Sequence, residues 1–142
     1  RWGNKQVSIT SVHFTDEKGK SKSTFKSGEY FEAQISYISQ LKDIHPVFGV
    51  AITTAYKFLL YGPNTLETEF PVGIPKKGKV RFIIPSLPLF NGDYLFSASV
   101  YDSELSIAYD HHEMMYQFQV LAQKSRVNGC IRIDSEWKIE SE

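Results

Sequence analysis

Apolar and polar positions alternate along most of the chain with a period of two, which is typical of β-strands that bury one face. Residues 5–14 carry the apolar positions Val7, Ile9, Val12 and Phe14. The phase of this alternation shifts near Thr10, and such a shift predicts a β-bulge. Six further segments are predicted as strands, namely 29–38, 47–54, 58–61, 79–84, 94–102 and 114–121. Residues 129–133 are predicted as an eighth strand, with 136–139 as a possible extension of it.

Turn residues separate these segments, and no window has the sustained periodicity of a helix with caps. Asn91-Gly92-Asp93 is a strong turn signal, residues 63–78 are rich in Pro and Gly, and residues 103–113 are expected to form a loop. About eight short strands at this spacing predict an all-β fold, an immunoglobulin-like antiparallel β-sandwich. One such domain accounts for residues 1–142.

The alternation also indicates which side chains face outward. If 47–54, 94–102 and 114–121 are the C, F and G strands of the sandwich, they are neighbours in one sheet. Their outer face then carries small and hydrogen-bonding side chains: Gly49, Ala51, Thr53, Ser97, Ser99, Gln117 and Gln119. Small residues lower the surface into a trough, and Tyr61 and Tyr101 are expected to wall it. A sugar ring needs an aromatic plane and several hydrogen-bond partners. The candidate carbohydrate-binding residues are therefore Thr53, Tyr61, Ser97, Ser99, Tyr101, Gln117 and Gln119; the alternative is an ordinary solvated sheet face.

Composition narrows the classes of function. The 142 residues include 16 Lys plus Arg and 16 Asp plus Glu, and this neutral balance argues against a nucleic-acid partner. A single cysteine, Cys130, allows no internal disulfide and no CxxC zinc pair. The longest apolar runs are far shorter than the roughly 20 residues that a membrane span needs. There is no signal peptide, and the chain starts at Arg1 rather than Met, so we expect a piece of a longer protein.

The sequence gives less support to metal binding or catalysis. Asp110-His111-His112 lacks further metal ligands at a suitable spacing, and a structural role for it is favoured, with Asp110 capping a turn. A triad of Ser103, His111 and Asp102 has no GxSxG sequence behind it. The acidic pairs Glu67/Glu69 and Asp102/Glu104 are expected to be solvated, and no phosphate-binding loop is present. We therefore expect no catalytic residue, no metal and no cofactor in this chain.

Six strings in one order carry a resemblance to a known family. They are Arg1-Trp2-Gly3, residues 48–52 (FGVAI), 61–65 (YGPNT), 84–89 (IPSLPL) before Gly92-Asp93-Tyr94, 109–112 (YDHH), and Gly129 followed eight residues later by Trp137. Together they resemble the C-terminal carbohydrate-binding domain of the ATP-binding subunit of bacterial O-antigen polysaccharide ABC exporters, the Wzt type. The resemblance extends from residue 1 to about 139.

The resemblance implies a specific biological setting. It implies an immunoglobulin-like domain that follows an ATPase domain in the intact subunit and works with the membrane-spanning exporter subunit. The expected location is cytoplasmic, at the inner face of the inner membrane. The expected ligand is the non-reducing terminal region of a lipid-linked O-antigen polysaccharide, whose binding selects finished chains for export. The resemblance also implies a homodimer with exchanged C-terminal strands, for which residues 127–139 are the candidate segment.

The resemblance also bears on individual residues. Features common to a family whose glycans differ are expected to be scaffold, which assigns Asn64 and residues 109–112 to loop structure and leaves the trough residues to choose the ligand. Arg81, expected in the other sheet, is a further candidate, for holding an acidic cap. The main hypothesis is a non-catalytic glycan-binding module. The alternatives are a dimerisation or subunit-docking module without glycan binding and, less favoured, a glycan-modifying enzyme.

Overall fold

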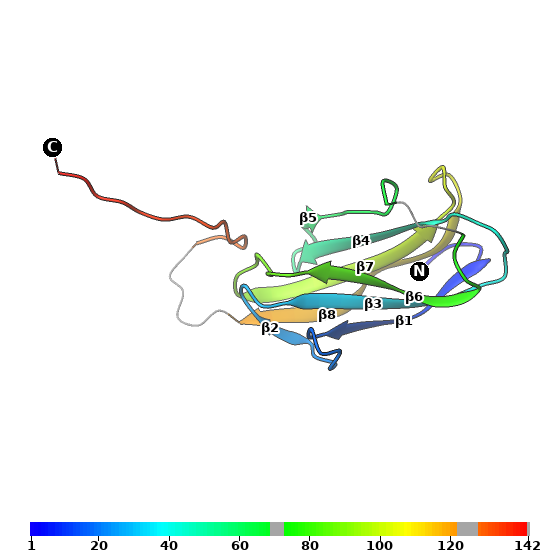
Figure 1. Cartoon of the computed structure of the whole chain (residues 1–142), viewed down its shortest axis with the longest axis horizontal. Helices are drawn as coiled ribbons and strands as arrows, with labels where there is room; N and C mark the ends of the chain where they lie inside the picture. Colours follow the sequence, from blue (N-terminus) through cyan, green and yellow to red (C-terminus); the bar gives the residue numbers. More distant parts are fainter. Residues whose placement is uncertain (69–72, 122–127, 142) are drawn as a thin grey trace.

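Two β-sheets pack face to face in the computed structural model, which describes residues 1–68, 73–121 and 128–141 (Figure 1). The three-stranded sheet has the order β1-β3-β6 and the five-stranded sheet the order β2-β8-β7-β4-β5. The strands are β1 (Val7–Thr15), β2 (Thr24–Lys26), β3 (Phe31–Ser39), β4 (Val47–Thr54), β5 (Leu59–Tyr61), β6 (Lys77–Ile84), β7 (Gly92–Tyr101) and β8 (Ala108–Leu121). The predicted all-β sandwich is confirmed, and β4 and β8 flank β7 as the C, F and G assignment requires.

Aromatic side chains from both sheets fill the space between them. Phe31 lies 4.8 Å from Phe118 and 5.0 Å from Phe25 between ring centroids, and Phe14 lies 5.3 Å from Phe96. These tilted and edge-to-face arrangements are the favoured geometries for buried aromatic rings. Many of the aromatic side chains of the chain therefore pack in the core.

The alternation of the sequence predicts the buried faces well. The inward positions of β3 and of β7, from Phe31 to Tyr37 and from Tyr94 to Val100, are all buried. The register between β1 and β3 shifts between Ile9 and Ser11, so the predicted bulge at Thr10 is also confirmed.

One strand pair departs from the predicted antiparallel arrangement. The short β2 pairs with β8 in parallel, with Phe25 opposite Val120. The sequence predicts no strand at β2, because a three-residue strand with one apolar side chain has no periodicity to detect. Phe25 is almost fully buried, so packing of a single ring against the core holds this segment in place.

The predicted loop at 103–113 is wrong in its second half, because residues 108–113 form the first part of β8. The inward positions here, Asp110 and His112, are polar, so the segment lacks the apolar alternation of a buried strand. Both lie between the sheets, where Asp110 has no exposed surface. This strand is stabilised by ion pairing and hydrogen bonds in place of an apolar stripe.

The predicted eighth strand at 129–133 does not form as a strand within this chain. Residues 128–141 lead away from the sandwich (Figure 1), with one isolated bridge between Leu89 and Ile131. The backbone contacts there are Phe90 N–H to Cys130 O at 3.0 Å and Arg132 N–H to Pro88 O at 2.6 Å. Residues 122–127, which include the start of the candidate exchanged segment, lie outside the described residues.

Candidate functional site

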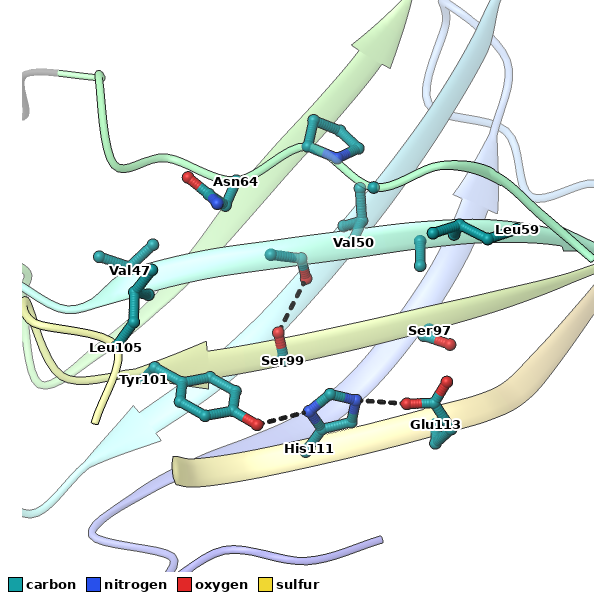
Figure 2. A pocket seen from close by; sticks show the side chains of 14 residues that line it. Val47, Val50, Leu59, Asn64, Ser97, Ser99, Tyr101, Leu105, His111 and Glu113 are labelled. Atoms are coloured by element: carbon teal, nitrogen blue, oxygen red, sulfur yellow. Dashed lines mark hydrogen bonds and ion pairs between the residues drawn. The ribbon is translucent and has the colours of Figure 1, made fainter. Parts of the chain in front are cut away.

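A trough lies on the outer face of the five-stranded sheet, across β4, β7 and β8 (Figure 2). Its middle is low because the side chains there are small: Gly49 has none, Ala51 ends at Cβ, and Ser99 adds one hydroxyl. Its volume is about 400 Å³, near the lower end of the range for ligand pockets. It is lined by Val47, Gly49, Val50, Ala51, Leu59, Gly62, Pro63, Asn64, Ser97, Ser99, Tyr101, Leu105, His111 and Glu113. We call this surface the trough.

The first wall is the chain that follows β5. Val50 N–H donates to Pro63 O at 3.0 Å and Thr65 N–H donates to Phe48 O at 2.9 Å, so residues 63–65 run along the edge of β4. Asn64 bridges to Gly49 in this pairing. A Cβ on Gly49 would lie 2.9 Å from Ser99 Oγ, so the absence of a side chain keeps the floor both low and closely packed.

The second wall is a row of connected polar side chains. Tyr101 Oη lies 2.9 Å from His111 Nδ1, and His111 Nε2 lies 2.6 Å from Glu113 Oε2 (Figure 2). The ring of Trp2 stacks on His111 with 3.9 Å between centroids and 14° between planes. Contacts on the ring face and at both nitrogens fix the orientation of His111.

β8 contains a bulge opposite Ser97, next to these side chains. Phe96 pairs with Tyr116 and Ala98 pairs with His112, so three residues of β8 lie opposite Ser97. Met114 takes a positive φ of 50° there, and its N–H donates to Ser97 Oγ at 2.7 Å. Because the bulge adds an even number of residues, the alternation of faces resumes unchanged. His111 and Glu113 therefore face the trough, and Asp110 and His112 face the core.

The inward residues of β8 anchor the N-terminal segment. Arg1 forms a bidentate pair with Asp110, at 3.1 Å from Nε to Oδ1 and 2.9 Å from Nη2 to Oδ2, and Ile9 N–H donates to Oδ2 at 2.8 Å. Burial opposes ionisation of Asp110, but these hydrogen bonds outweigh it and hold its pKa below the usual range. Burial lowers the pKa of His112, whose Nε2 lies 3.2 Å from Asp110 Oδ2. Asp110 therefore has a structural role, on a strand rather than at the predicted turn cap.

Three of the predicted binding residues, Ser97, Ser99 and Tyr101, line the trough. Ser97 is nearly buried, and its hydroxyl already accepts the hydrogen bond from Met114 N–H. Ser99 Oγ lies 3.5 Å from Gly49 O. Of the three side chains, Ser99 and Tyr101 are thus the ones with the most capacity left for a ligand.

The other four predicted residues lie elsewhere. Thr53 is only 3% exposed, and its hydroxyl donates to Leu95 O at 3.3 Å. Tyr61 pairs with Ile52 and lines a separate apolar hollow of about 260 Å³. Gln117 and Gln119 are exposed but lie beyond the β8 bulge, opposite Leu95 and Asp93. The trough occupies one half of the sheet face rather than its whole length.

Sequence reasoning missed three polar residues of the trough: Asn64, His111 and Glu113. Asn64 and His111 belong to the strings that carry the family resemblance, which assigned them to loop structure. The outward direction of His111 depends on residues 108–113 being a strand, which their polar inward positions hid. No pattern in the sequence pointed to Glu113 as part of a binding surface.

The catalytic alternatives find little support in the geometry. Asp102 accepts hydrogen bonds from Ser106 N–H at 2.8 Å and Ile107 N–H at 2.7 Å, so its carboxylate stabilises its own turn. Both nitrogens of His111 are engaged by Tyr101 and Glu113, which argues against a triad of Ser103, His111 and Asp102. Within residues 1–68, 73–121 and 128–141, no three His, Cys, Asp or Glu side chains are grouped to hold a metal ion. Glu69 lies outside the described residues.

Comparison with known proteins identifies the family. The Wzt C-terminal domain family matches residues 1–133. The chain belongs to the Wzt C-terminal domain family. A crystal structure of the C-terminal domain of wzt superposes with a TM-score of 0.84 at 18% identity, covering 98% of this chain and 87% of that one. No curated protein matches the chain.

A second solved structure shares the fold alone. Pseudomonas fluorescens alkylpurine DNA glycosylase AlkC, bound to DNA containing an abasic site analog, superposes with a TM-score of 0.52 at 12% identity. The match covers 82% of this chain and 31% of the glycosylase. At this identity only the sandwich architecture is shared.

Membership of the Wzt C-terminal domain family supports a role in an O-antigen ABC exporter. A Wzt C-terminal domain alone is non-catalytic, which agrees with the engaged side chains of Asp102 and His111. In the described part of the chain, no helix has the length and hydropathy required to cross a bilayer.

Proposed function

We propose that this domain binds the non-reducing terminal region of a lipid-linked O-antigen polysaccharide and thereby selects finished chains for export. The observation that carries the proposal is the trough: a shallow surface of about 400 Å³ with a tyrosine, a stacked histidine and several hydrogen-bonding groups around a floor of small residues. Sugar rings pack on aromatic planes and hydrogen-bond at their edges. The intact subunit would act at the cytoplasmic face of the inner membrane, joined to its ATPase domain and the membrane-spanning subunit.

The proposed contact residues follow from the geometry. Ser99, Tyr101, Asn64, His111 and Glu113 surround the floor and would contact the terminal sugar. The exposed Gln117 and Gln119 lie farther along the same sheet face and would meet a following sugar. Each hydrogen bond in so open a site contributes about 0.5–1.5 kcal/mol net, so a Kd on the order of millimolar to micromolar is expected.

A titration with the terminal oligosaccharide of the O-antigen from the same cell tests this function. Backbone amide shifts are expected to concentrate at residues 97–101, 111–113 and 49–51. The control is an oligosaccharide of the internal repeat, without the terminal sugar, which should bind more weakly. Shifts confined to other parts of the domain would refute the site, and no shifts at all would refute the function.

A second role, dimerisation, is favoured by the C-terminal segment. Trp137 is 98% exposed and Ile139 fully exposed, although large apolar side chains are usually buried. We propose that residues 127–139 pair with a second copy of the chain, as strands exchanged between protomers.

Removal of residues 134–142 is expected to convert a dimer into a monomer, because it deletes Trp137 and Ile139 and leaves the sandwich intact. Sedimentation equilibrium on the full and shortened chains measures this change. A shortened chain that remains dimeric would contradict the exchange, and a full chain that is monomeric at all concentrations would contradict dimerisation.

A further inference from the structure

The trough carries an unbalanced charge. Glu113 is the one lining residue with a formal negative charge, and no Lys or Arg is among the lining residues that the structure describes. Its side chain is 42% exposed and so is accessible to a ligand. A bound anion would therefore meet a carboxylate, with no lining Lys or Arg to offset it.

The candidate for an anion-binding cation, Arg81, lies elsewhere. Arg81 is on β6 of the other sheet, as expected, and holds Glu32 through a bidentate pair of 2.9 Å and 2.8 Å. The hydrogen bonds from Arg81 lower the pKa of Glu32 to about 2, against the effect of burial. The guanidinium is thus paired with a buried carboxylate, and Arg81 is not among the residues that line the trough.

The hydrogen-bond order along the second wall leaves free acceptors at Tyr101 and Glu113. A carboxylate only accepts hydrogen bonds, so His111 Nε2 must donate to Glu113 Oε2. In the neutral imidazole Nδ1 then accepts, and the Tyr101 hydroxyl donates to it. This order leaves lone pairs on Tyr101 Oη and on Glu113 Oε1 for donors from a ligand.

We propose that the trough selects a terminal sugar that presents hydroxyl or ammonium donors and discriminates against one that carries phosphate, sulfate or carboxylate. The inference rests on the proposed glycan-binding function and names the class of sugar for that site. Hydroxyl and ammonium groups match the free acceptors of Tyr101 and Glu113. An anionic substituent brings only further acceptors to Tyr101 Oη and Glu113 Oε1, so it forms no hydrogen bond with them. The charge of Glu113 also repels it.

The test compares two forms of the terminal oligosaccharide of the cell's own O-antigen: the native form, and the form in which primary hydroxyls have been oxidised to carboxylates. Binding of each to the full chain is followed by amide shifts at pH 8. Oxidation is expected to weaken binding to the wild type about tenfold, because it places a carboxylate near Glu113. In E113Q the same oxidation should cost about twofold or less, since the repelling charge is gone. The control, E17Q, changes an exposed carboxylate in the turn after β1 and should behave like the wild type.

The results separate the proposed selectivity from the proposed glycan binding. Equal weakening by oxidation in the wild type and in E113Q would overturn the selectivity, because the loss would then be steric. A native terminal sugar that carries an acidic group and still binds in the trough would overturn it as well. In both cases the proposed function would stand. If the native oligosaccharide produces no shifts in the wild type, the proposed function and this inference fail together.

Discussion

Replacement of Asp110 by alanine is expected to lower the free energy of unfolding by about 2–4 kcal/mol. The carboxylate has no exposed surface and holds three elements together: the guanidinium of Arg1, the N–H of Ile9 in β1, and β8 itself. Alanine leaves the Ile9 N–H without its acceptor and removes the counter-ion of Arg1. Urea denaturation followed by tryptophan fluorescence measures the change, because Trp2 belongs to the anchored segment.

D110N provides the graded comparison. Asparagine keeps the shape and an acceptor for Ile9 N–H but loses the charge, so we expect a smaller loss than for alanine. E113A changes an exposed carboxylate on the same strand and should stay within about 0.5 kcal/mol of the wild type. A D110A protein as stable as E113A would show that the buried pair is not required. If D110A does not fold, D110N still decides the question.

The same cluster should make the wild type sensitive to acid. The pKa of Asp110 is lower in the folded protein than its ordinary value, so the unfolded chain binds the proton more readily. The stabilisation is therefore complete at neutral pH and is lost as the pH falls below about 4 and through the folded pKa. The pKa of Glu32 is also lowered, so Glu32 contributes to the acid sensitivity of both proteins. The measurement is therefore the difference in the free energy of unfolding between wild type and D110N, which should become smaller as the pH falls.

The positions and buried faces of the strands were predictable where burial alone determines the pattern of apolar and polar residues. β3 and β7 alternate apolar and polar side chains over most of their length because one face of each packs on the core. The start of β8 escaped detection because its buried positions are polar: Asp110 is stabilised by the distant Arg1 and Ile9, and His112 lies against Asp110. An ion pair between residues more than 100 positions apart in the sequence leaves no periodic pattern to detect.

The sequence also predicted part of the candidate site, namely the sheet face on which it lies. Small residues on the outer face of β4 and β7 follow from alternation, which is why Ser99 and Tyr101 were expected at the trough. Thr53 and Gln119 share that face, yet the trough ends before them. Its extent is set by the path of residues 62–65 and by the β8 bulge at Met114. Alternation specifies a face, whereas loops and bulges specify which part of it is hollow.

Replacement of Ala51 by phenylalanine is expected to abolish oligosaccharide binding, a loss of at least about tenfold, with little change in stability. Ala51 is on the outward face of β4, opposite Ser97, and lines the floor of the trough. A phenyl ring there occupies the space in which a sugar would lie, while aromatic residues are well tolerated on a pleated strand surface. Amide-shift titration with the terminal oligosaccharide measures the loss, and thermal unfolding checks that the fold is intact.

The matched control is S36F. Ser36 is also a small, outward position in the middle of a strand, but on β3 of the opposite sheet, paired with Ser11 and Lys79. It adds the same ring to the same fold away from the trough, so binding should remain within about twofold of the wild type. If A51F binds like the wild type, the ligand does not lie in the trough. If S36F loses binding equally, the effect of A51F is not local, and binding depends on the sandwich as a whole rather than on the low floor between β4 and β8.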